Sequence, residues 1–295
     1  MAEPQRFISR EGRSTLVIHG VRRRLFEDLY HSWLAASWRR VFAVVVVLYV
    51  AVNALFGALF FWAGGIEGAA PGSFSDAFFF SVQTLATIGY GKMSPVTLPA
   101  HLLVTVESLC GLTGLALMTG LMFAKFARPT ARVIWSEVAV VSMMDGVPSL
   151  MFRVANARGN QVVEAQMRLG MLRSEVTAEG MPVRRQHDLK LVRPSSAVFA
   201  LSWLCIHRID EASVLHGQTL ESLQQGQAEL YCSLTGLDET FGQTIHSRHS
   251  YAAGEIAWGR RFEDIMGPLP DGRMGVDYAR FHNTLPAPLD GSKAG

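Results

Sequence analysis

The sequence contains little cysteine. Its 295 residues include three, Cys110, Cys205 and Cys232, an odd number without a C-x-x-C spacing. We therefore expect neither a disulfide framework nor a zinc site, and a reducing cytosolic environment suits Cys205 and Cys232. His246 and His249 have an H-x-x-H spacing, but no third ligand follows at a suitable distance, so we expect no metal site there.

The motifs of common enzymes are also missing. The chain has no G-x-S-x-G, no P-loop and no H-E-x-x-H pattern, and no G-x-G-x-x-G that would indicate a nucleotide-sensing domain. These patterns place nucleophiles, phosphates or metals in most recognisable active sites. We therefore predict that the protein is not an enzyme and needs no cofactor.

Charge is scarce in one part of the chain only. Residues 41–127 contain five charged side chains, whereas residues 128–295 contain 17 Lys/Arg and 18 Asp/Glu. The first 40 residues contain eight Arg and four acidic residues. This division excludes a single soluble domain, a disordered chain and a wholly membrane-embedded transporter. It predicts a basic N-terminal segment, a small membrane part and a soluble domain with its own core.

Two apolar runs predict membrane spans. Residues 41–66 carry no charge, and as a helix they would be about 39 Å long, enough for a hydrocarbon core of roughly 30 Å. Residues 101–124 are interrupted only by Glu107. Basic residues flank both runs on the side away from residues 67–100, so both termini are expected in the cytoplasm of an inner-membrane protein.

A third apolar stretch, residues 77–91, is too short to cross a membrane. Irregular backbone at membrane depth is tolerated only inside protein or along a water-filled cavity. Ser73 and Ser75 precede the stretch as candidate helix N-caps. The pattern therefore predicts a short re-entrant helix that ends at a pore.

That helix leads directly into the sequence T-I-G-Y-G, which predicts a potassium filter. Backbone carbonyls of residues 87–90 and the Thr87 hydroxyl can replace the hydration shell of K⁺, as in the T-V-G-Y-G loops of potassium channels. Glycine permits the backbone angles that align successive carbonyls. The filter residues are Thr87, Ile88, Gly89, Tyr90 and Gly91. The chain has one such loop, so four copies must surround the ion, and we predict a homotetramer.

The chain as a whole resembles the inward-rectifier potassium channels, most closely their bacterial KirBac-type branch. The resemblance covers nearly the whole chain and rests on LYHSW…SWRR, TLATIGYG, FAKFARP, RQHDLKLVR, FALSWLCIHRID and LDETFGQTIHSRHSY. It implies a membrane α plus β fold, with an interfacial slide helix, two spans, a re-entrant pore helix and a cytoplasmic immunoglobulin-like β-sandwich. The implied domains are residues 1–40, 41–128 (pore helix and filter 74–91) and 129–295.

A stripe of residues on the second span predicts the pore lining. Gly111, Leu115, Thr119 and Phe123 recur every fourth residue on one helix face. The ring of Phe123 near the cytoplasmic end predicts a hydrophobic gate, and the resemblance implies that Gly111 and Gly120 are hinges. Helix–helix packing is the alternative role for the whole stripe.

Several positions depart from the pattern that the resemblance implies. Leu115 replaces an Asp or Asn and Thr235 replaces an acid, so strong block by Mg²⁺ or polyamines is not expected. Gln83 replaces a Glu behind the filter and is predicted to support the filter backbone by hydrogen bonding. Glu164 matches a family position whose carboxylates ring the cytoplasmic pore and hold cations, and a solvated surface acid is the alternative. Glu107 is the one acid within the second span and therefore a candidate functional residue, but it lies near the outer end of the span, where we expect it to be solvated.

Basic residues near the inner membrane surface predict a lipid site. Residues 25–36 suit a helix lying in the interface plane. A pocket for anionic lipid heads such as phosphoinositides is predicted from Arg39, Arg40, Lys125, Arg128 and Arg132. The alternative is that these charges only set the topology. The soluble domain is nearly neutral, so nucleic acid is not an expected partner.

Alternating apolar runs after Pro129 predict the strands of the β-sandwich: residues 149–157, 164–176, 187–193, 197–206 and 228–236, with a helical turn at 220–225. The predicted function is a potassium-selective channel of inward-rectifier type, with K⁺ as transported ion and Ba²⁺ or Mg²⁺ as blockers. Alternatives are a non-rectifying ligand-gated two-span channel, a potassium transporter subunit and a membrane-anchored sensor. A transporter would carry four pore loops in one chain, and a sensor gives the T-I-G-Y-G stretch no role.

Overall fold

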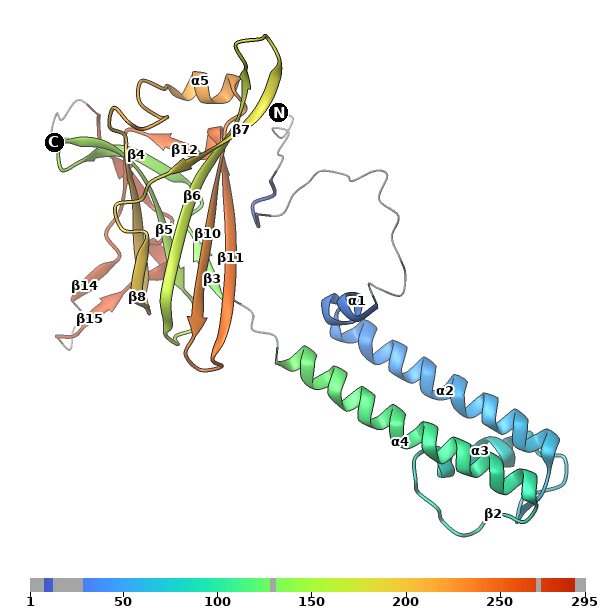
Figure 1. Cartoon of the computed structure of the whole chain (residues 1–295). Helices are drawn as coiled ribbons and strands as arrows, with labels where there is room; N and C mark the ends of the chain where they lie inside the picture. Colours follow the sequence, from blue (N-terminus) through green and yellow to red (C-terminus); the bar gives the residue numbers. More distant parts are fainter. Residues whose placement is uncertain (1–7, 13–28, 128–130, 269–271, 290–295) are drawn as a thin grey trace. The chain divides into compact units, whose positions relative to one another are not determined.

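The structure is a computed structural model of the chain and describes residues 8–12, 29–127, 131–268 and 272–289. The chain divides into two compact units. One, Gly20–Arg128, is helical, and the other combines Met1–His19 with Pro129–Gly295 and is built of strands (Figure 1).

The described part of the helical unit contains two long helices and two short ones. Its elements are α1 (Leu29–Ala35), α2 (Trp38–Ala63), α3 (Phe74–Leu85) and α4 (Leu98–Phe126), with the paired two-residue strands β1 (Ile66–Glu67) and β2 (Ser94–Pro95). Hydroxyl caps begin the three longer helices, because the side chains of Ser37, Ser73 and Thr97 accept hydrogen bonds from backbone N–H groups in the first turn.

The two long helices have the length and composition of membrane spans. α2 has 26 residues and a mean hydropathy of 2.5, and α4 has 29 residues and 1.7. Only 22 % and 6 % of their most apolar windows are buried within the chain, unlike the core helices of a soluble protein. α2 begins and ends three residues earlier than the predicted span at residues 41–66. The N-cap Ser37 starts the helix, and Gly64, at φ 61°, ends it. α1 covers the described part of the predicted slide helix, while residues 25–28 lie outside the described residues.

The short helix α3 packs closely between the two long ones. Phe60 of α2 meets Phe80 of α3 edge to face, with ring centroids 5.0 Å apart. A Cβ on Gly57 would lie 3.0 Å from Cα of Phe78, and one on Gly111 of α4 would lie 2.5 Å from the Leu85 carbonyl oxygen. Glycine at these two positions therefore lets both long helices approach the backbone of α3.

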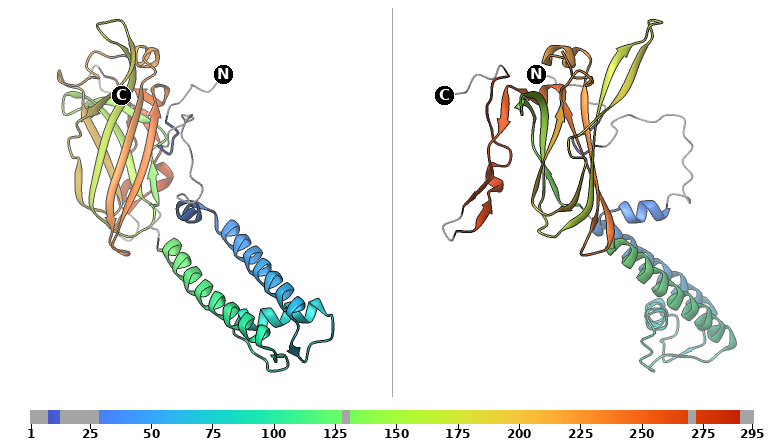
Figure 2. Two further views of the ribbon diagram at one scale, coloured as in Figure 1. Left: turned by 45° about the vertical axis from the view of Figure 1, so that its right-hand side comes forward. Right: turned by 60° about the vertical axis from the view of Figure 1, so that its left-hand side comes forward.

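The strand unit consists mainly of two five-stranded sheets that pack face to face (Figure 2). In one sheet the order is β11-β10-β6-β7 with β8 also paired to β6, and in the other β12-β4-β5-β3 with β9 also paired to β5. Both sheets contribute fully buried side chains such as Phe152 of β5, Met167 of β6 and Leu230 of β10 to one core. The predicted fold class, two spans with a C-terminal β-sandwich, is confirmed.

The strand bounds of the first sheet are β6 (Val162–Val176), β7 (Pro182–Leu189), β8 (Ser195–Phe199), β10 (Glu229–Asp238) and β11 (Gln243–Ala252). Those of the second sheet are β3 (Val133–Trp135), β4 (Ala139–Met144), β5 (Val147–Asn156), β9 (Ser202–Arg208) and β12 (Ile256–Trp258). The remaining elements are α5 (Leu220–Gln225), β13 (Arg260–Phe262), β14 (Met266–Pro268), β15 (Met274–Val276), β16 (Thr284–Pro286) and two 3₁₀ turns, Ala253–Glu255 and Tyr278–Arg280.

The predicted single strand at 197–206 is wrong. The stretch forms the end of β8 and most of β9, which belong to different sheets. β8 pairs with β6 and β9 pairs with β5. β9 alternates between buried and partly buried residues, whereas β8 buries only Phe199. No Gly or Pro separates the two pieces, so the sequence reads as one continuous strand although the chain changes sheets near residues 200–201.

One buried cation joins β5 to the C-terminal segment. Arg153 is 7 % exposed and donates hydrogen bonds to the backbone oxygens of Glu263 (2.7 Å) and Phe281 (3.4 Å). Its guanidinium also lies over the rings of Phe262 and Phe281, 4.6 and 5.6 Å from their centroids. Burial lowers the pKa of Arg153. The two carbonyls and the two ring faces replace the water that the guanidinium loses when it is buried.

The start of the chain lies beside the strand unit. The backbone oxygen of Arg10 accepts a hydrogen bond from the Ser250 N–H of β11, at 3.1 Å. Arg10 also pairs with Glu255, and the Ile8 N–H donates to Glu229 at 3.0 Å. The chain therefore enters the helical unit from a point tied to the sandwich and returns to the same sandwich after α4.

The glycine contacts predict opposite effects of two matched substitutions. Gly111→Ala places a methyl against the Leu85 backbone, which overpacking typically penalises by about 1–3 kcal/mol. Gly120→Ala meets no atom within 4 Å and gains about 1 kcal/mol of helix propensity. Thermal unfolding of the purified protein should show a lower midpoint for Gly111→Ala and an unchanged or higher one for Gly120→Ala. Equal midpoints would contradict the close approach of α4 to α3.

Candidate functional site

The segment after α3 has an alternating backbone. Thr87, Gly89 and Gly91 have φ angles of 55°, 56° and 76°, in the left-handed region that glycine enters at little steric cost. The end of α3 fixes where the segment starts, because the Ile88 N–H donates to the Gln83 carbonyl at 2.8 Å and the Thr87 N–H to the Thr84 carbonyl at 3.1 Å. The predicted filter is therefore an irregular segment held at one end by a helix.

The carbonyl oxygens of this segment have no partner within the described part of the chain. None of the carbonyls of residues 87–90 accepts a hydrogen bond from another described residue. The side chains are open as well, with Ile88 45 % and Tyr90 75 % exposed. Carbonyl oxygens that receive no hydrogen bond from the chain need another positively charged or hydrogen-bond-donating partner if they are buried in a membrane. Such a row of oxygens can ligate cations.

Gln83 contacts the segment through its backbone, and the predicted support by its side chain stays a prediction. Its backbone carbonyl receives the Ile88 N–H, while its side-chain amide makes no hydrogen bond to another described residue. The support that position 83 gives within this chain is therefore part of the helix end and independent of the side chain.

Two residues of the stripe on α4, Gly111 and Leu115, line the same groove as the start of the filter. A groove of about 400 Å³ is lined by residues of α2, the end of α3 and α4, among them Thr87, Gly111 and Leu115. Further along the helix Thr119 donates its hydroxyl proton to the Leu115 carbonyl at 2.8 Å, and Phe123 is 73 % exposed. Gly111 contacts the end of α3, whereas a methyl group placed on Gly120 would have no described neighbour within 4 Å.

Lys125 makes contacts that the sequence did not predict. It is only 9 % exposed, and its Nζ donates to the carbonyls that end α1, those of Trp33 (3.3 Å), Leu34 (3.1 Å) and Ala36 (2.6 Å). It also lies 5.3 Å from the Trp38 ring centroid. A cation at a helix C-terminus satisfies free carbonyls and the helix dipole. Lys125 therefore attaches the slide helix to the end of α4.

The other predicted lipid-binding residues are divided between the two units. Arg39 and Arg40 are exposed in the first turn of α2, in the same unit as Lys125. Arg132 is exposed but belongs to the strand unit, and Arg128 lies outside the described residues.

Glu107 is not solvated, contrary to the expectation. Its side chain is fully buried, and so are Ser81 and Asn53, with which it forms a polar cluster between α2, α3 and α4. A run of apolar residues with one acid gives no sign of this partnership. Serine on the short helix and asparagine on the first span are the only signals in the sequence, and both are too common to identify a cluster in advance.

Glu164 occupies an irregularity in β6. Its φ is 51°, and the pairing with β10 shifts register between Thr235 and Leu237. Bulges of this kind re-aim a side chain, and Glu164 is exposed. Thr235 contacts His246 through its hydroxyl at 3.2 Å. His249 stacks on Trp135 at 5.6 Å, so the two histidines contact different residues.

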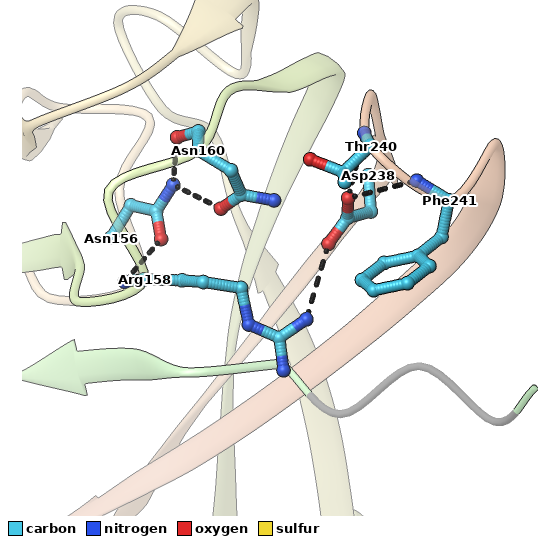
Figure 3. Close-up of polar contacts among 6 residues, drawn as sticks. All are labelled: Asn156, Arg158, Asn160, Asp238, Thr240 and Phe241. Carbon is cyan, nitrogen blue, oxygen red and sulfur yellow. Dashed lines mark hydrogen bonds and ion pairs between the residues drawn. The ribbon is translucent and has the colours of Figure 1, made fainter. Parts of the chain in front are cut away.

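The turn between β10 and β11 is held by a second cluster that sequence reasoning missed (Figure 3). Asp238 is 2 % exposed and accepts from the backbone N–H groups of Thr240 and Phe241, at 3.0 and 3.3 Å. Arg158 pairs with the same carboxylate at 3.5 Å and lies 5.9 Å from the centroid of the Phe241 ring. Asn156 accepts from the Arg158 N–H at 3.0 Å. These contacts therefore hold the turn at the tip of this hairpin in one conformation.

Comparison with known proteins agrees with these features. Residues 133–293 match the inward rectifier potassium channel C-terminal domain, and residues 38–128 match the ion channel family. The chain is 45 % identical over 283 residues to the inward rectifier potassium channel Kirbac3.1 of Paramagnetospirillum magnetotacticum, covering 95 % of this chain and 96 % of that one.

Animal channels are similar over most of the chain as well. Identity is 32 % to the mouse G protein-activated inward rectifier potassium channel 3, covering 98 % of this chain and 80 % of the relative. It is 31 % to the human inward rectifier potassium channel 18, covering 96 % and 71 %. These relatives are ion channels and not enzymes. With its two membrane helices, its β-rich C-terminal domain and these matches, the chain belongs to the inward rectifier potassium channel family.

Proposed function

We propose that four copies of this chain form a potassium-selective pore with the T-I-G-Y-G segment as its filter. The observation that carries the proposal is the row of unpaired carbonyls at residues 87–90 beside left-handed backbone at Thr87 and Gly89. One copy supplies one side of an ion's coordination shell, and a four-fold axis supplies the remainder. K⁺ is the transported ion, no step calls for a cofactor, and Ba²⁺ or Mg²⁺ would block by entering the same path.

We propose further that the pore lies in the inner membrane with both termini in the cytoplasm, and that Phe123 closes it. The Leu115 and Phe123 side chains are 68 % and 73 % exposed on the chain alone, which leaves them free to face a common axis. An apolar ring at Leu115 offers no charge for Mg²⁺, so weak rectification follows. A non-rectifying ligand-gated channel remains the second candidate, because it shares every one of these features.

The basic residues near the inner surface are proposed to bind anionic lipid. Arg39 and Arg40 present two exposed charges, and Lys125 lies at the C-terminal end of α1. Basic clusters beside spans attract anionic lipid by about 1 kcal/mol per residue. A phosphoinositide headgroup bound there would act on the slide helix and on the end of α4, two residues beyond Phe123.

The filter is tested by Gly89→Ala. A Cβ at φ 56° costs roughly 1–2 kcal/mol per copy, so we expect loss of Ba²⁺-sensitive uptake of radioactive Rb⁺ into K⁺-loaded liposomes. Gly72→Ala is the matched control, because Gly72 has φ 69° and similarly open surroundings but lies outside the filter. Uptake that persists in Gly89→Ala and matches Gly72→Ala would sink the filter assignment.

The gate is tested by Phe123→Ala, which removes the largest side chain from the stripe. We expect a several-fold higher rate of Rb⁺ uptake, because the constriction can no longer exclude water. Leu117→Ala shortens a similarly exposed side chain of α4 that lies off the stripe, and it should leave the rate unchanged. Equal rates in both variants would assign Phe123 to packing.

The lipid proposal is tested by the double substitution Arg39→Gln and Arg40→Gln. We expect the uptake rate to lose much of its response when phosphoinositide is added to the liposomes. Arg261→Gln, an exposed arginine of β13, should keep the full response. An unaltered response in the double variant would mean that these charges only set the topology.

A further inference from the structure

A buried polar cluster joins the three membrane helices behind the filter. Glu107 of α4, Ser81 of α3 and Asn53 of α2 are each fully buried. Ser81 Oγ contacts both neighbours: it is hydrogen-bonded to Glu107 Oε1, and it lies 3.1 Å from Asn53 Oδ1. Polar side chains in a membrane are costly unless they are paired. Each contact in this cluster is therefore expected to have one hydrogen-bond donor and one acceptor.

The orientation of the Asn53 amide is fixed by its own helix. Nδ2 donates to the Tyr49 carbonyl at 2.7 Å. The reversed amide would place Oδ1 against that carbonyl, with two acceptors in contact and no proton between them. Asn53 therefore presents its oxygen to Ser81 and acts there as an acceptor.

Ser81 has one hydroxyl proton for two acceptors. If Glu107 were an ionised carboxylate, it would be acceptor-only, and either Asn53 Oδ1 or Glu107 Oε1 would face the Ser81 oxygen without a proton. If Glu107 carries a proton, it donates to Ser81 Oγ and Ser81 donates to Asn53 Oδ1. Every contact then has one donor and one acceptor.

The second carboxyl oxygen of Glu107 also favours a protonated acid. Glu107 Oε2 is buried and has no hydrogen-bond partner among the described residues. A charged oxygen in that position would be uncompensated, whereas the carbonyl oxygen of a neutral acid costs far less to bury. Within the described part of this unit, no cation contacts the carboxyl group.

We propose that Glu107 is an uncharged carboxylic acid that positions the pore helix, through a chain of hydrogen bonds from Glu107 to Ser81 to Asn53. Ser81 lies two residues before Gln83, whose carbonyl anchors Ile88. Fixing Ser81 against α2 and α4 therefore fixes the position of α3 and of the first filter carbonyls. Glu107 is a positioning residue and does not touch the ion. The inference rests on the proposed potassium pore for its functional part only.

The protonation state is tested by infrared spectroscopy at neutral pH on the protein in an alkyl glycoside detergent, which lacks the ester carbonyls by which lipids absorb in the same region. The C=O stretch of a protonated carboxyl lies above the amide I band, and we expect it in the wild type and not in Glu107→Gln. Glu67→Gln, which alters an exposed glutamate of β1, should leave the band in place. A wild type without the band, or a band that survives in Glu107→Gln, would overturn the proposal whether or not the protein conducts.

The positioning role is tested by rescue. Glu107→Gln keeps a donor toward Ser81 and should retain Ba²⁺-sensitive Rb⁺ uptake. Glu107→Ala breaks the chain, and Ser81→Ala removes its centre, and each should lower uptake by about tenfold or more. Comparison is restricted to variants that elute as the wild-type oligomer, and Ser81→Ala serves if Glu107→Ala does not assemble.

Three results would contradict this role. Full uptake in Glu107→Ala would show that the contact is dispensable. Uptake in Glu107→Gln as low as in Glu107→Ala would show that a neutral donor is not what the site requires. Full uptake in Ser81→Ala would show that the chain does not pass through the pore helix. Absence of uptake in the wild type itself would instead count against the proposed function and leave the infrared result intact.

Discussion

The rest of the structure depends on one constraint, the unpaired backbone oxygens that follow α3. Residues 87–90 present carbonyls that no described group of the chain satisfies, in a part of the protein flanked by two helices of membrane-spanning length. Backbone left unpaired in a membrane is expensive. It persists only if something else takes the place of hydrogen-bond donors. In the proposed tetramer, desolvated potassium ions coordinated by four copies of the segment would meet that requirement.

The helical unit is built to hold this segment in place. Glycine at positions 57 and 111 lets α2 and α4 reach the backbone of α3, and Phe60 and Phe80 pack edge to face between α2 and α3. The buried cluster of Asn53, Ser81 and Glu107 fixes how the three helices are oriented against one another, since hydrogen bonds specify a geometry that apolar contacts alone do not. At the other end of α4, Lys125 ties the helix to the C-terminus of α1. A change at the slide helix therefore reaches the same helix that carries the stripe.

The strand unit shows the same combination of apolar packing and a few specific polar contacts. Its two sheets share one core, and Arg153 ties the C-terminal segment to β5 through two carbonyls and two rings. Asp238 and Arg158 shape the turn between β10 and β11. The two arginines lie far in the sequence from the residues they contact, Arg153 from Glu263 and Phe281 and Arg158 from Asp238, and the fold of the strands brings them together.

The sequence by itself determined the features that depend on local composition and order. Two long apolar runs, a short one between them and the T-I-G-Y-G segment predict spans, pore helix and filter, because hydropathy and glycine act through nearby residues. Tertiary structure alone decided the roles of Glu107, Lys125 and Gly111. Their partners are Ser81, the carbonyls of residues 33, 34 and 36, and the Leu85 backbone, 26 to 92 residues away. It also decided that the run at 197–206 divides between two sheets, since a hydrophobic alternation is the same whichever sheet receives the strand.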